Sequence, residues 1–191
     1  MSVLYVPPCP TTCSGAVADV SFNECAPENN WGEVSKIYIA ASDFESVDNA
    51  GNPGFSDVTS LTEWNDNLSD TVDDKIRTLV VLGDLPEAET TEVATSGDRI
   101  AIGYKTFNLV FEIDETNETN YNFLLMSECG GKYLIWYETS GGLLFGGNLG
   151  IEVSLKLNYL IPRERTALQK IMGKATWKAL QSPFRCTSPL V

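Results

Sequence analysis

The chain has 191 residues, a length typical of one folded domain that needs no disulfide or metal to hold its core. With 43% hydrophobic and 20% charged residues it has a globular composition, and no apolar run approaches the ~20 residues of a membrane span. The formal net charge of -13 argues against a surface that binds nucleic acid, because neutralising phosphates requires clustered Lys and Arg.

The charges are distributed unevenly along the chain. Residues 43–120 hold 18 of the 26 acids and 4 of the 13 bases, whereas residues 156–191 hold 7 bases and one acid, Glu164. If these segments lie on different faces, the acidic surface of one copy can meet the basic surface of another, which favours head-to-tail association over a two-fold dimer. The alternative is that the acids lie in solvated loops and only aid solubility.

Residues 1–33 have prolines at four positions and little periodicity, which predicts an extended arm that lies on another surface, such as a neighbouring copy. The arm contains Cys9, Cys13 and Cys25, which could supply three thiolates to a zinc site. Zinc spacings are usually tighter and the chain has no histidine, so free or buried thiols are favoured and no cofactor is expected. The arm lacks the pattern of a secretory signal, so we expect folding in a cytoplasm.

Residues 34–191 are expected to form a single β-rich domain. Residues 34–41 alternate enough for a strand, and residues 42–59 form a Gly, Asn and Asp rich loop whose length suggests a function. Ser60 and Glu63 form a capping-box signature for a short helix. The core anchors expected on this helix are Leu61, Trp64 and Leu68.

Three strands are expected next, over residues 75–82, 89–95 and 99–113, with a turn at 96–98. Clean alternation near the end of the third strand predicts one buried face. The residues of that face are Phe107, Leu109, Phe111 and Ile113.

A helix of about three turns is expected to be capped in the region 117–120 and to end at Gly130 and Gly131. Its apolar positions are Tyr121, Leu124, Leu125 and Cys129. A meander follows over residues 132–138, 143–147 and 150–160, with Ile151, Val153, Leu155 and Leu157 on one face.

Beyond Pro162, two further strands are expected at 166–172 and 174–180, broken by Gly173, with helix as an alternative for the first. The fold class is therefore α+β and mainly β. We expect an antiparallel barrel or sandwich with one packed helix, a second short helix and an extended N-terminal arm.

The sequence carries no histidine, nucleophile elbow, P-loop or dinucleotide fingerprint, so we expect no enzyme. Glu112, Asp114, Glu115 and Glu118 cluster and could bind calcium or form a glycosidase pair. Acids at a strand end and a helix N-terminus are, however, favoured as caps and dipole partners. The four tryptophans, Trp31, Trp64, Trp136 and Trp177, could line a sugar groove, but their scatter over different elements favours core packing or subunit contacts.

Several stretches together resemble the tail-tube proteins of tailed bacteriophages. They are the N-terminal arm, KIYIA, the long acidic loop, DKIRTLVVLGDLP, the run GYKTFNLVFEIDETNETNYNFLLMSECGGKYLIWYETSGGLLFGGNLGIEVSLKLN, and ATWKA. The resemblance covers most of residues 34–180 as a pattern of elements. It implies a β-barrel with one packed helix, whose arms and loops bind neighbouring subunits in stacked, usually hexameric, rings.

The resemblance also implies partners and a location. The partners would be copies of the protein and other virion proteins, with DNA passing through an acidic channel without sequence-specific binding, no membrane, and a virion location after synthesis in the host cytoplasm. We expect residues 42–59 and 85–97 at subunit interfaces, and deletion of residues 43–56 to leave a folded monomer that does not assemble. The expected interface residues are Asp43, Phe44, Phe55, Leu85, Glu87, Glu89, Arg163, Arg165 and Lys174.

Two other classes of protein fit the same sequence. One is another virion component, such as a decoration, head-completion or tail-terminator protein. The other is a bacterial carbohydrate- or peptide-binding module, which predicts a monomer with a defined pocket and exposed Trp or Tyr.

Overall fold

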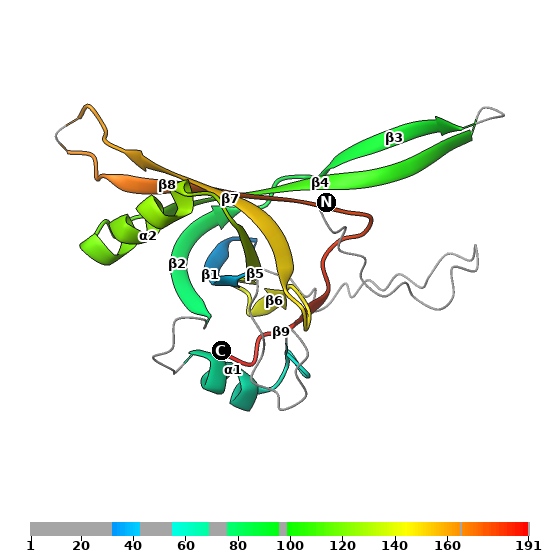
Figure 1. Cartoon of the computed structure of the whole chain (residues 1–191), viewed down its shortest axis with the longest axis horizontal. Helices are drawn as coiled ribbons and strands as arrows, with labels where there is room; N and C mark the ends of the chain where they lie inside the picture. The colour runs from blue at the N-terminus through cyan, green and yellow to red at the C-terminus, as the bar shows by residue number, and fades with distance from the viewer. Residues whose placement is uncertain (1–31, 43–54, 69–75, 96–98, 165, 191) are drawn as a thin grey trace, which may run out of the picture.

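The computed structural model describes residues 32–42, 55–68, 76–95, 99–164 and 166–190, and its core is a barrel (Figure 1). Six antiparallel strands close the barrel in the order β1-β2-β4-β8-β7-β5, and β5 pairs with β1. The elements are β1 (Val34–Ala41), α1 (Leu61–Leu68), β2 (Arg77–Asp84), β3 (Glu89–Thr95), β4 (Arg99–Ile113), α2 (Glu118–Glu128), β5 (Lys132–Thr139), β6 (Leu143–Phe145), β7 (Ile151–Leu160), β8 (Lys170–Ala179) and β9 (Arg185–Thr187). The predicted mainly β fold with two small helices is confirmed, and the barrel is the form it takes.

The first core fills the barrel and is built by alternation along each strand. The predicted inward residues of β4 and β7 are all buried, and Trp177 of β8 stacks on Phe107 with ring centroids 5.2 Å apart. Alternate residues of a strand point to opposite faces, so one apolar face per strand is enough to fill the interior. The buried residues of β4 and β7 are Phe107, Leu109, Phe111, Ile113, Ile151, Val153, Leu155 and Leu157.

The prediction of two strands separated at Gly173 is wrong, because β8 runs through this residue without interruption. Gly173 lies directly opposite Phe111 of β4, and a Cβ atom there would lie 2.2 Å from Cζ of that ring. The glycine therefore provides room for a core side chain and does not end the strand.

A second core lies outside the barrel wall, where α1 and residues 55–58 cover β1 and β5. Trp64 is fully buried, and its ring centroid lies 4.5 Å from that of Phe55 and 5.9 Å from that of Trp136. Indole N–H donors in this core are satisfied, since Trp64 Nε1 donates to the carbonyl of Val58 at 2.8 Å. The strands β1 and β5 are thus buried on both faces.

The anchors predicted on α1 are correct in part. Trp64 is buried and Leu68 packs against the second core, but Leu61 is exposed. Only half of the predicted capping box forms: Ser60 Oγ accepts from the N–H of Glu63 at 3.4 Å. The Glu63 carboxylate instead accepts from the N–H and hydroxyl of Ser56, so it ties α1 to the segment before it.

The helix α2 is capped as predicted but packs by a different face. Asn117 is the N-cap, with its side chain accepting from the N–H of Asn120 at 2.8 Å, and Gly130 follows the helix with φ +77°. Leu124 and Ser127 are the buried residues. The predicted apolar stripe is wrong at three positions, since Tyr121, Leu125 and Cys129 are exposed, because the short helix lies beside β7 with one narrow face and its ends in solvent.

Two extensions leave the barrel in different directions (Figure 1). The strands β3 and β4 project together as a long hairpin, and the joined ends of β7 and β8 project on the other side, near α2. We call the β3–β4 extension, residues 89–106, the hairpin arm.

Candidate interaction site

The strands β3, β4, β8 and β7 form an antiparallel sheet whose outermost strands, β3 and β7, each have an open edge in the described part of the chain. The described residues place no strand on the outer side of β3, which pairs with β4 alone. At the opposite end, β5 pairs with β7 only as far as Ser154, so residues 155–160 have no strand beyond them in the described part of the chain. Unpaired N–H and C=O groups on such edges are templates for pairing with another chain.

The β7 edge is partly sheltered by α2. A space of about 400 Å³ separates the end of this helix from residues 154–158 of the strand. The backbone of this part of the edge therefore borders a hollow beside the end of α2.

The sheet face that points away from the barrel interior is basic at its β7–β8 end. Lys156 and Lys174 are exposed and lie directly opposite each other on adjacent strands. Like charges in this position are destabilising, and among the described side chains neither lysine has a carboxylate partner. Lys178, on the same face, lies 4.5 Å above the ring of Tyr104.

The same face is acidic at its β3 end. Glu89 lies opposite Thr106, which lies opposite Lys178, so all three side chains share one face. Glu89 is exposed, whereas Glu92, three residues further along β3, points to the opposite face because the extra residue of the register shift lies on β4. This face therefore carries two lysines near the β7 edge and one glutamate at the β3 edge.

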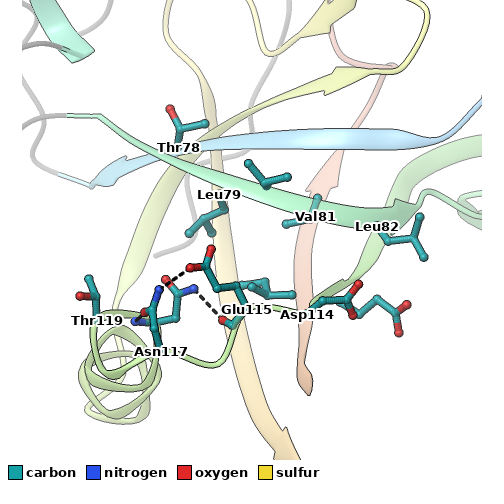
Figure 2. A pocket seen from close by; sticks show the side chains of 12 residues that line it. Thr78, Leu79, Val81, Leu82, Asp114, Glu115, Asn117 and Thr119 are labelled. Atoms are coloured by element: carbon teal, nitrogen blue, oxygen red, sulfur yellow. Dashed lines mark hydrogen bonds between the residues drawn. The ribbon is translucent and has the colours of Figure 1, made fainter. Parts of the chain in front are cut away.

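A groove of about 530 Å³ lies between β2 and the start of α2 (Figure 2). Only residues 82–84 of β2 pair with β4, because β4 ends at Ile113 and the chain then turns into α2. The groove lies beside the earlier part of β2, which has no β4 residue next to it. Its apolar wall includes the exposed side chains of Val80 and Leu82, and its other wall carries Asp114 and Glu115. None of the described residues that line the groove is aromatic.

The acids beside this groove have local partners. Lys170 Nζ lies 2.8 Å from Glu112 and 3.2 Å from Asp114, and these hydrogen bonds raise the pKa of Lys170. Asn117 Nδ2 donates to Glu115 Oε1 at 2.9 Å. The arrangement agrees with the capping interpretation, and within the described ranges no group of three or more His, Cys, Asp or Glu side chains could hold a metal.

The expected interface residues fall into three sets. Glu87, Glu89, Arg163 and Lys174 are exposed, with Glu87 and Glu89 at the base of the hairpin arm. Leu85 packs partly against the barrel core, and Phe55 is only 4% exposed because it belongs to the second core. Asp43, Phe44 and Arg165 lie outside the described residues, as do the thiols Cys9, Cys13 and Cys25 and the indole of Trp31.

The burial of Phe55 corrects the deletion suggested by the sequence. Removing residues 43–56 would remove a ring that contacts both Trp64 and Trp136, so the fold itself would be damaged. Sequence reasoning placed this phenylalanine in a polar loop and had no signal for its aromatic neighbours.

Sequence reasoning also missed Lys156. Its alternation on β7 was visible, but its position opposite Lys174 depends on the register between two strands. Only that register shows that the two charges are adjacent.

The remaining thiols and helices add little chemistry. Cys129 is a free exposed thiol, and burial raises the pKa of the free thiol of Cys186, which keeps it protonated. Neither described helix is long and apolar enough to cross a membrane.

Comparison with known proteins finds no matching family model, no matching curated protein and no matching solved structure.

Proposed function

We propose that this protein is a structural subunit of a phage virion, a tail-tube protein that self-associates into stacked rings around a DNA-conducting channel. The carrying observation is the four-stranded sheet with open edges at its two opposite ends. If β3 of one copy adds to β7 of the next, each copy uses two different edges, and repetition gives a closed ring or a helical filament.

The direction of the strands suits this addition. Four antiparallel strands alternate in direction, so β3 and β7 of one copy run oppositely. When copies are related by rotation about an axis roughly along the strands, the joint between β7 and the next β3 is antiparallel, like every other pairing in the sheet. The sheet can therefore continue from copy to copy without a break in its hydrogen-bond pattern.

The two edges are staggered along the strands. β3 pairs with residues 99–106 of β4, whereas residues 155–159 of β7 are level with residues 109–113 of β4. Joining them offsets each sheet from the next, and a sheet that closes into a barrel requires such an offset because its strands are tilted. This geometry favours a tube wall over a flat array.

The hairpin arm should also have little stability of its own in an isolated monomer. A two-stranded ribbon is marginally stable in water, and residues 99–104 of β4 have β3 as their one strand partner in the described chain. Pairing with another copy would stabilise it. We infer that the virion is where the protein acts, after synthesis in the host cytoplasm, with copies of itself and other virion proteins as partners.

The test is to remove the hairpin arm without disturbing the barrel. Glu89 and Thr106 lie directly opposite each other, so residues 90–105 can be replaced by Asn-Gly, which closes a two-residue hairpin turn. In negative-stain electron microscopy and light scattering at rising concentration, the natural protein should form rings or tubes. The shortened variant should remain a folded monomer with the far-UV circular dichroism of a β protein.

Three other results would change the conclusion. A natural protein that stays monomeric at every concentration and at both low and high salt contradicts self-assembly. Single rings that never stack favour another virion component, such as a tail terminator. Tubes formed equally well by the shortened variant would show that the hairpin arm is not the joint.

A further inference from the structure

A pocket of about 290 Å³ lies at one end of the barrel, where β1 begins and β2 and β5 end. Its aromatic wall consists of Tyr137 of β5 and Phe145 of β6, whose rings are stacked with their centroids 4.8 Å apart. Arg185 of β9 lies directly opposite Phe145, which lies opposite Tyr137, so the three side chains share one face. The other lining residues are Gly32, Val34, Leu85, Thr139 and Leu143.

Chain continuity brings one more aromatic residue to this pocket. The backbone of Glu33 is held beside it, because its carbonyl accepts a hydrogen bond from the N–H of Ser140 at 2.8 Å. Gly32 lines the pocket, and Trp31 is the next residue toward the N-terminus. Consecutive Cα atoms lie about 3.8 Å apart, so the side chain of Trp31 starts within reach of the pocket.

The chemistry of the pocket walls suits an indole. Aromatic rings pack against one another in stacked or edge-to-face arrangements, and a guanidinium is attracted to the face of an indole. Phe145 is only partly buried and Arg185 is exposed, so each has surface that an indole can cover. No carboxylate side chain is among the described lining residues, and within the described ranges Arg185 has no ion pair that would compete for it.

We propose that the side chain of Trp31 occupies this pocket in its own subunit and anchors the root of the N-terminal arm to the barrel. The sequence left core packing and subunit contact open for this tryptophan, and the pocket favours packing within the subunit. Leu85, which lines the same pocket, lies just before β3. The N-terminal arm therefore leaves the barrel beside the base of the hairpin arm. This inference does not depend on the proposed self-assembly.

The first test is fluorescence quenching by acrylamide, which is uncharged and so is not repelled by a protein of net charge -13. The other three tryptophans are at most 4% exposed, so readily quenched emission from the folded protein can come only from Trp31. We expect the folded protein to be quenched several-fold less than the urea-unfolded chain, and Trp31→Phe to leave that difference unchanged. Readily quenched emission that disappears in Trp31→Phe would place the indole in solvent and overturn the proposal.

Protein concentration distinguishes a subunit's own pocket from that of a neighbour. Light scattering identifies the range in which the natural protein, or the variant with a shortened hairpin arm, is monomeric. Protection of Trp31 in this range supports the proposal, even if no rings or tubes ever form at higher concentration. Protection that appears only on assembly would assign the pocket to the arm of another copy, which overturns this inference and leaves the proposed function intact.

Thermal unfolding tests the contacts in the pocket. Trp31→Ala should lower the unfolding midpoint by about 4–8 °C, because it removes a packed indole. The matched control is Phe22→Ala, which removes an aromatic ring from the same arm and should lower the midpoint by less than about 1 °C. In combination with Arg185→Ala, the shift should be smaller than the sum of the two single shifts, because the two side chains are in contact. Equal shifts for Trp31→Ala and Phe22→Ala, or strict additivity with Arg185→Ala, would contradict the placement.

Discussion

The hydroxyl of Tyr38 on β1 lies 2.7 Å from Oε2 of Glu138 on β5 and donates a hydrogen bond to this buried carboxylate. Ser188 Oγ, from the end of the chain, lies 3.1 Å from the same oxygen, and Lys36 Nζ lies 3.4 Å from Oε1. A buried charge is tolerated only with such partners. Glu138 thus joins the two strands that close the barrel to the C-terminal segment.

Replacing Tyr38 by Phe should lower the free energy of unfolding by about 1–3 kcal/mol, because it removes a hydrogen bond to a buried carboxylate and keeps the ring. Urea unfolding followed by tryptophan fluorescence measures the change. The control is Tyr121→Phe, whose ring is 43% exposed and which should cost less than about 0.5 kcal/mol. Equal losses in the two variants would mean that the hydrogen bond to Glu138 contributes nothing.

The buried phenols should make the protein unstable at alkaline pH. Burial raises the pKa of Tyr137 well above its ordinary value of 10.0, and burial followed by the hydrogen bond and charge of Glu138 does the same for Tyr38. Above pH 10 the unfolded chain loses these protons while the folded protein keeps them, so the unfolded state binds fewer protons and stability falls as the pH rises.

Tyr137→Phe isolates this effect, because burial alone raises the pKa of Tyr137. Above pH 10, the free energy of unfolding of the variant should fall less steeply with pH than that of the natural protein. The two slopes should differ by about 1.4 kcal/mol per pH unit. Urea unfolding at intervals from pH 8.5 to 11.5 gives both slopes. Parallel curves for the variant and the natural protein would contradict the prediction.

Phe55 should behave as a core residue of the monomer. Phe55→Ala should lower the free energy of unfolding by about 3–5 kcal/mol, because the ring fills space between Trp64 and Trp136. Phe184 is half exposed, so Phe184→Ala is the control and should cost less than about 1 kcal/mol. A Phe55→Ala monomer of natural stability that fails to assemble would restore the interface role expected from the sequence.

Gly173 should be intolerant of even one added methyl group. Gly173→Ala forces the ring of Phe111 to move within a packed core and should cost about 1–3 kcal/mol. The added substitution Phe111→Leu shortens the opposing side chain and should make the alanine less costly than it is alone.

Gly131→Ala is the matched control for Gly173→Ala. A Cβ at residue 131 would meet the ring of Tyr133 no closer than 3.7 Å, an ordinary contact. Comparable thermal shifts for the two alanine variants would show that the position opposite Phe111 is not crowded.

The sequence by itself determined most of the strands and the buried faces of β4 and β7. Alternation over residues 107–113 and 151–157 identified the inward side chains of β4 and β7, because a strand with one apolar face has a period of two residues. The turn at residues 96–98 placed the ends of β3 and β4 at Thr95 and Arg99, and Asn117 was recognised near the helix start by its capping chemistry.

Tertiary structure decided the features that depend on what lies across from a residue. The sequence predicted a strand break at Gly173, but the structure places the ring of Phe111 opposite it. It predicted a loop position for Phe55, but the structure packs that ring against two indoles. The open edges of β3 and β7 and the opposed lysines on β7 and β8 likewise follow from strand order and register. Local propensity carries no information about these long-range pairings. The open edges and the opposed lysines could therefore be identified only from the tertiary structure.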